Sequence, residues 1–225
     1  MQAWAVDRGY DYLSVGDELF ERLPDWYALK VAPRKPIAAD LARLLWIFEK
    51  LQTEEHDVVA WFDADVYVFA PELLSVAPQT SCVFGGEYWL DEHDKTPGLR
   101  IHKNVHNAYC AFRGDCPILT FLIEAIQRMV RRVDPAFIAP QFVGPKLLTS
   151  LHNIVGFELE PGVGAISPFL AQALINDDMR VLNYLSQALP QPMLAANLCL
   201  SLHADTSIDM NVLLDVLALL KNGLK

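Results

Sequence analysis

Two aspartates, Asp63 and Asp65, directly follow a short apolar segment, Val58–Phe62. The apolar run predicts a strand covered on both faces, and ligands of open α/β sheets bind where such strands end. Side chains two positions apart in an extended segment point the same way, so the two carboxylates can converge. Close carboxylates repel each other when both are ionised, and a divalent cation removes that conflict while holding phosphate oxygens. The pattern predicts a Mg²⁺ or Mn²⁺ site for a diphosphate; the plainer alternative is a solvated turn.

A second pair of chemically useful side chains, Asp40 and Arg43, lies earlier in the chain. Pro36 suits the first turn of a helix. Apolar residues recur at helical spacing after this proline, at Ile37, Leu41, Leu44, Leu45 and Phe48. Asp40 and Arg43 share a helical face that is offset from this apolar stripe. Taken alone, the pair indicates a surface ion pair; the alternative is contact with a bound ligand.

These segments occur in an order that resembles a known family. Ala39–Arg43 is followed by Val59–Asp65, which ends in Asp-x-Asp, and then by Pro71–Leu73. The order resembles nucleotide-sugar glycosyltransferases of the GT-A fold, above all the bacterial capsular-polysaccharide and mannosyltransferase-like groups. Asn104–Phe112 is similar to the strand that lies beside the donor sugar in that family, and Gly144–Thr149 is similar to its "G-P-x-x-L-T" helix start.

The resemblance implies roles for individual residues. Asp63 and Asp65 would hold a Mn²⁺ or Mg²⁺ ion that bridges the donor diphosphate, and His203 would complete the metal shell. Asp40 and Arg43 would contact the donor sugar or its phosphates and, with the two aspartates, would form the catalytic group. The implied donor site also includes Ala64, Asn104, Asn107 and Lys146.

The activity implied by the resemblance is transfer of a sugar from a UDP- or GDP-sugar donor to a hydroxyl acceptor, a sugar or glycoconjugate. Such a reaction would belong to polysaccharide or glycoconjugate synthesis. The cation would stabilise the departing diphosphate while the acceptor hydroxyl attacks the anomeric carbon.

Alternating strand-like and helical segments predict an α/β fold in one domain, residues 1–225. We expect a mixed, mostly parallel sheet flanked by helices, with Val58–Phe62 at its centre and a mainly helical part over residues 168–225. Tyr10–Val15 is expected to be a strand. The resembled fold opens with another strand before it, which we expect to be missing, because the chain begins in what resembles the following helix, Gln2–Trp4.

Other segments are assigned by their patterns. Ser81–Phe84 and His106–Arg113 are expected to be strands, and the polar segment between them, Trp89–Lys103, a surface excursion. Pro117–Arg132 is predicted to be a long amphipathic helix. A further helix is expected to begin at Pro145.

Composition narrows the classes of partner. The chain has 225 residues, and its 28 acidic and 18 basic residues give a net charge of −10. A chain this acidic is a poor candidate for nucleic acid or anionic membrane. Its four cysteines form no Cys-x-x-Cys pair and are interpreted as reduced thiols of a cytoplasmic protein. No apolar run reaches the roughly 18–20 residues of a membrane span.

Two other functions remain open at this stage. Phosphatases of the haloacid dehalogenase type also place a nucleophile in a strand-end Asp-x-Asp motif. Their motif usually has Thr or Val at its fifth position, where this chain has Tyr67. The third possibility is a catalytically lapsed GT-A-like protein that binds a sugar or nucleotide without turnover.

Overall fold

A computed structural model describes residues 1–53, 55–92, 98–139, 141–199 and 210–221. Its α-helices are α1 (Gln2–Asp7), α2 (Asp25–Val31), α3 (Lys35–Gln52), α4 (Pro117–Arg132), α5 (Pro145–Val155), α6 (Pro168–Ile175), α7 (Met179–Ala188) and α9 (Met210–Lys221). Its strands are β1 (Val58–Phe62), β2 (Val66–Val68), β3 (Cys82–Glu92), β4 (Leu99–Arg113), β5 (Glu158–Glu160), β6 (Val163–Ala165) and β7 (Ala195–Asn197). The predicted α/β class is confirmed.

The strands form two mixed sheets, with the orders β1-β4-β3-β5 and β2-β7-β6. The pairs β1·β4, β3·β4 and β2·β7 are antiparallel, whereas β3·β5 and β6·β7 are parallel. The expectation of a mostly parallel sheet is therefore not confirmed. The physical reason is the connection between β3 and β4, which pair directly as a hairpin, whereas parallel neighbours need a long crossover.

The strand β1 borders the larger sheet, so its predicted central position is wrong. Its apolar run has another cause. On one face, the Trp61 ring packs edge-on against Trp46 of α3, with centroids 5.7 Å apart. On the other face, Phe62 packs against Tyr109 of β4 at 4.8 Å. A short strand with both faces packed is apolar throughout, whether it lies at the centre or at the border of its sheet.

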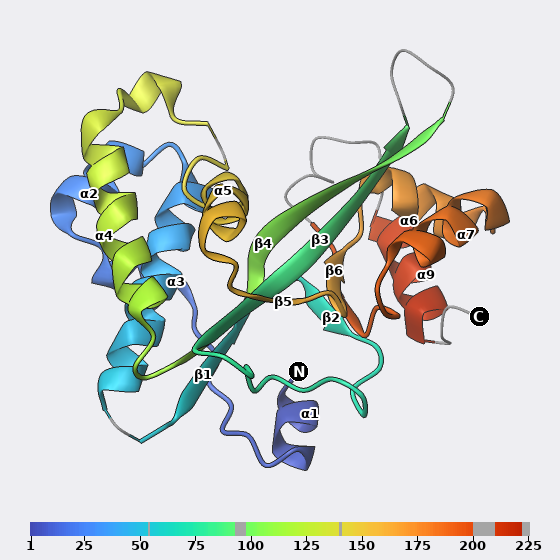
Figure 1. The fold of residues 1–225 in the computed structure, drawn as a ribbon, viewed down its shortest axis with the longest axis horizontal. Coiled ribbons are helices and arrows are strands. Elements are labelled where there is room, and N and C mark those ends of the chain that lie inside the picture. Colours follow the sequence, from blue (N-terminus) through green and yellow to red (C-terminus); the bar gives the residue numbers. More distant parts are fainter. Residues whose placement is uncertain (54, 93–97, 140, 200–209, 222–225) are drawn as a thin grey trace.

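The β3–β4 hairpin divides the molecule (Figure 1). Helices α2, α3, α4 and α5 gather on one side of the hairpin, and α6, α7 and α9 lie on the other. Of the segment Trp89–Lys103, expected to be a surface excursion, residues 89–92 and 99–103 instead belong to the outer halves of β3 and β4. Leu90 in this half is fully buried in a core that includes Ile166 and Leu170.

Helix α3 forms where its sequence predicts, but of the predicted buried stripe Phe48 is exposed and Leu45 is only partly buried. A proline occupies its first turn, where no backbone N–H is needed. Its buried apolar residues recur every three or four positions, at Ile37, Leu41, Leu44, Ile47 and Leu51. Asp40 and Arg43 are buried as well, so they are not the surface pair that their offset from the stripe suggested.

The N-terminal segment contains α1 and no strand at Tyr10–Val15, which corrects the expectation for that segment. Trp4 of α1 anchors the segment: its ring meets Phe62 edge-on at 5.8 Å, and its Nε1 donates to the carbonyl oxygen of Pro71 at 2.9 Å. Among the residues that the structure describes, no helix has both the length and the apolar character of a membrane span.

Candidate functional site

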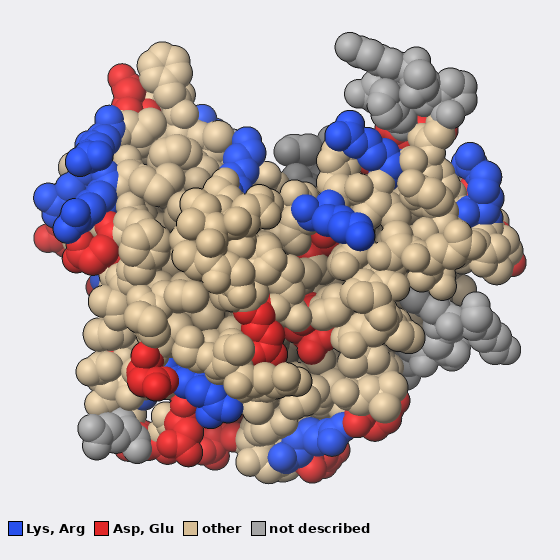
Figure 2. All heavy atoms as spheres, in the orientation of Figure 1, with Lys and Arg blue, Asp and Glu red and all other residues tan. Residues whose placement is uncertain are grey.

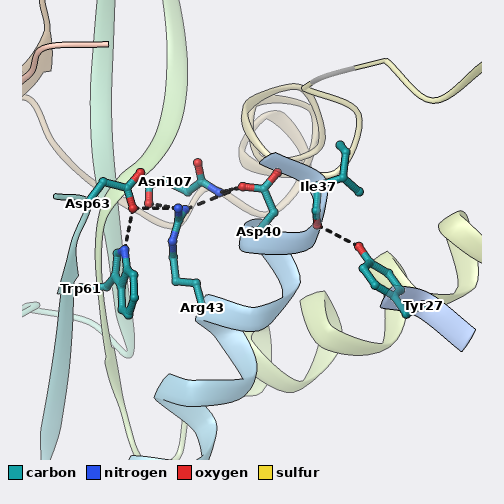
Figure 3. Close-up of polar contacts among 7 residues, drawn as sticks. All are labelled: Tyr27, Ile37, Asp40, Arg43, Trp61, Asp63 and Asn107. Carbon is teal, nitrogen blue, oxygen red and sulfur yellow. Dashed lines mark hydrogen bonds and ion pairs between the residues drawn. The ribbon is translucent and has the colours of Figure 1, made fainter. Parts of the chain in front are cut away.

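Arg43 of α3 joins the end of β1 to the middle of β4 (Figure 3). Its Nη2 lies 2.7 Å from Oδ1 of Asp63, the first residue after β1. Its Nη1 donates to the backbone carbonyl of Asn107 in β4, also at 2.7 Å. A helix that packs across the sheet thus fixes the first aspartate of the Asp-x-Asp motif with a charge-assisted hydrogen bond.

Asp63 is held by a second donor from its own strand. The indole Nε1 of Trp61 donates to the same Oδ1 atom at 2.6 Å, and the guanidinium of Arg43 lies 5.6 Å from the Trp61 ring centroid. The backbone N–H of Asp63 bonds to the carbonyl of Ala108 at 2.7 Å. These contacts set the position of the Asp63 carboxylate from three directions.

Asp40 lies one helical turn before Arg43 and completes the group. Its Oδ1 accepts from Asn107 Nδ2 at 2.7 Å and lies 3.8 Å from Arg43 Nη1. Burial raises the pKa of Asp40 to about 6, even though Arg43 and Asn107 act to lower it. We refer to Asp40, Arg43, Trp61, Asp63 and Asn107 as the Arg43 network.

Gly144, the residue before α5, closes over this network. A Cβ atom at this position would lie only 2.7 Å from Asp40 Oδ2. Glycine is therefore required by close approach, since no ordinary Cβ contact is so short. This contact brings the predicted "G-P-x-x-L-T" segment against the predicted Asp40–Arg43 helix.

The charges of the network are unequally exposed. The side chains of Arg43 and Asp40 are 6% and 9% exposed, whereas that of Asp63 is 26% exposed. Burial acts to lower the pKa of Arg43, but Asp63 and then Asp40 outweigh it, so the pKa is raised. Arg43 is therefore a permanent cation, and Asp63 is the charged member of the network that solvent reaches best.

The second aspartate of the motif, Asp65, is half-buried beside the exposed Ala64. Its backbone carbonyl accepts from the N–H of Leu198, just after β7, at 2.9 Å. Burial raises the pKa of Cys199 to about 12, and the charges of Glu87, Asp65 and Asp63 add to this rise. The negative charges of both aspartates therefore affect Cys199, just beyond the end of β7.

The fit of this region to a divalent cation is partial. The described residues contain no group of three His, Cys, Asp or Glu side chains that could hold a metal ion. His203, the predicted third ligand, lies outside the described residues. Asp63 is already paired with a guanidinium, which weakens its attraction for a metal. Any cation here would need Asp65 together with oxygen ligands from a bound molecule.

Three predicted donor-site residues lie outside the Arg43 network, and one of them, Ala64, is exposed after β1. Asn104 of β4 donates through Nδ2 to Glu87 Oε2 of β3 at 3.0 Å. Lys146 is exposed in the first turn of α5. Of the predicted residues, the network brings together Asp40, Arg43 and Asn107 with Asp63.

Sequence reasoning missed the polar role of Trp61, which entered the analysis only as part of the apolar segment Val58–Phe62. The signal was present, because Trp61 and Asp63 are two positions apart and point to the same side of an extended segment. Glu87 was also missed, and nothing in its local sequence distinguishes it; its position follows from the pairing of β3 with β4.

No protein-family model and no curated protein matches this chain.

Proposed function

We propose that the protein is a metal-dependent glycosyltransferase that moves a sugar from a nucleotide-diphosphate donor to a hydroxyl acceptor. The observation that supports this most strongly is the convergence on Arg43. Its guanidinium contacts Asp63 and the carbonyl of Asn107, and it lies near Asp40. Three segments that resemble the GT-A family from separate parts of the sequence thus meet at one side chain.

In this proposal Arg43 and Trp61 are positioning residues, because both hold Asp63 Oδ1. Asp65 and the donor diphosphate together bind the cation, and the partly exposed Asp63 carboxylate orients the donor. The cation, when bound, neutralises charge on the departing diphosphate. The buried Asp40 keeps Arg43 and Asn107 in place and does not itself contact the donor.

The proposal extends to a GT-A-like fold and to a cytoplasmic protein that acts on a UDP- or GDP-sugar. Free cysteines support a reducing compartment: Cys82, Cys110, Cys116 and Cys199 all lack a disulfide partner in the described structure.

Thermal melting of the full chain tests donor binding. We expect UDP or GDP to raise the melting temperature mainly when Mn²⁺ is present, because the diphosphate and Asp65 complete one cation shell. Asp65→Asn should abolish the Mn²⁺ dependence. Asp115→Asn makes the same chemical change at an exposed residue after β4 and should leave it intact.

Other results of this experiment, or of assays for product release, would favour a different site or a different function. A nucleotide shift that persists unchanged in Asp65→Asn would place the diphosphate elsewhere and overturn the assigned site. Binding without release of nucleotide from any nucleotide sugar would favour a lapsed protein. Release of phosphate from p-nitrophenyl phosphate would favour a phosphatase.

A further inference from the structure

A groove with a volume of about 370 Å³ lies beside the β3–β4 hairpin. The hairpin forms one wall of this groove, and the second half of α5 forms another. The β5–β6 turn and the segment after α7 close the remaining sides. The polar and aromatic side chains of the lining include Glu87, Tyr88, Lys103, Asn104, His152 and Asn153. The volume is that of a typical small-molecule site.

The charged groups of the groove are already paired across the hairpin. Glu87 lies directly opposite Asn104 and accepts its amide hydrogen bond at 3.0 Å. Lys103 lies opposite Tyr88, and its ammonium is 5.4 Å from the ring centroid. The lining contains one acid and one lysine, which balance. This balance within the lining favours an uncharged ligand, whereas elsewhere on the face drawn in Figure 2 Asp and Glu side chains gather near the centre.

The remaining polar groups suit a ligand rich in hydroxyls. Asn153 is exposed on α5 and offers an amide donor and acceptor. Thr149 Oγ1 accepts from the N–H of Val105 at 2.9 Å, which leaves its hydroxyl proton to donate. The His152 ring packs on Phe157 at 4.9 Å, and its buried Nδ1 has no hydrogen-bond partner in the described structure.

Apolar groups line the groove as well. Leu159, Pro161 and Pro190 do so together with the amides. A sugar ring presents hydroxyls at its edge and C–H groups on its faces, so it matches a lining that offers both amide and apolar groups. A purely apolar ligand would leave the amides unpaired, which is costly.

The groove lies close to the Arg43 network. Asn104 precedes Asn107 by three residues on β4, which corresponds to roughly 10 Å along a strand. A ligand in the groove would therefore lie roughly 10 Å along β4 from Asn107, the member of the Arg43 network on that strand.

We propose that this groove binds a neutral saccharide and that this saccharide is the acceptor of the transfer reaction. The second half of the statement rests on the proposed function, whereas the binding of a neutral saccharide does not. Glu87, Asn104 and Asn153 supply the hydrogen bonds that orient the ring.

The test uses immobilised neutral and acidic oligosaccharides, with the labelled full chain as the probe. We expect the wild-type chain to bind neutral members of the panel. Asn153→Trp fills the groove and should abolish this binding. Ile154→Trp places the same side chain one residue further along α5, at a position that is 80% exposed and outside the groove lining, and should bind as wild type does.

Asn153→Ala provides a milder variant that adds no bulk to the groove. It removes one side-chain amide, so neutral saccharides should bind about three- to tenfold more weakly. Binding of acidic saccharides alone, binding of none, or equal binding by Asn153→Trp would overturn the inference. The Mn²⁺-dependent nucleotide shift, measured on the same variants, separates the two proposals. A shift without saccharide binding removes only the groove inference. Saccharide binding without a shift removes the transferase and with it the acceptor role, but leaves the saccharide site.

Discussion

Arg43 and Asp63 form an ion pair of 2.7 Å that joins helix α3 to the end of β1, with the arginine buried and the aspartate partly open to solvent. This ion pair matters both for the stability of the fold and for the proposed site. The buried charge must be neutralised for the helix to pack, and the same contact holds the motif carboxylate at the surface.

Arg43→Met tests the structural part of this link. The change retains an unbranched side chain but leaves Asp40 and Asp63 without their cation. Removing one partner of a buried pair typically costs about 3–5 kcal/mol, so we expect urea unfolding at pH 7 to show a loss of this order. Arg22→Met is the control. Arg22 pairs with Glu49 at 2.8 Å on the surface, where the cost should be about 0–1 kcal/mol. Equal losses in both variants would contradict the buried-pair account.

Trp61→Phe removes a hydrogen bond that positions the Asp63 carboxylate and leaves the charge of that carboxylate in place. The ring remains, but the 2.6 Å hydrogen bond from Nε1 to Asp63 is lost. We expect the nucleotide-dependent rise in melting temperature to shrink, with a stability loss of about 1–3 kcal/mol. Trp46→Phe alters the ring that packs against Trp61 and should leave the nucleotide effect unchanged. A variant of Trp61 that binds nucleotide like wild type would show that Asp63 needs no such support.

Asp40 should give a distinctive pH dependence. Its pKa is raised from 3.8 to about 6, chiefly by burial, so the folded state favours the protonated form. The stabilisation from this group is fully present below about pH 4 and is lost as the pH rises through 6. Compared with Asp40→Asn, the wild type should therefore lose about 2–3 kcal/mol of unfolding free energy between pH 4 and pH 7. Parallel curves for the two proteins, from urea titrations across this range, would show that Asp40 is not desolvated.

Gly144→Ala tests the contact between α5 and the network. The new Cβ would lie 2.7 Å from Asp40 Oδ2, so either the helix start or the carboxylate must shift. Overpacking of this kind costs about 1–3 kcal/mol, and nucleotide binding should weaken with it. At Gly114 the added Cβ would meet nothing within 4 Å, so Gly114→Ala should change stability little. A neutral Gly144→Ala would mean that the two segments do not depend on each other.

The predictable parts of this fold are those with local signals. Pro117–Arg132 was predicted with the bounds that α4 has, because a proline and a regular apolar spacing mark it. The resemblance implied that Arg43 and Asp63 share a site, and the two side chains do lie in contact. The β3–β4 hairpin was missed, because its outer half is polar at many positions and its pairing is a relation between distant residues. The burial of Asp40 and Arg43 was missed for a similar reason, since the strands that cover them come later in the chain.

Release of nucleoside diphosphate from a panel of UDP- and GDP-sugars, with Mn²⁺ and a mixture of neutral saccharide acceptors, tests the central claim most directly. We predict that the wild-type chain releases UDP or GDP from at least one donor and transfers its sugar to a saccharide. Asp65→Asn should lose this activity, and Asp115→Asn should retain it. Release from no donor, or release that is equal in Asp65→Asn, would contradict the assignment of a metal-dependent glycosyltransferase to this site.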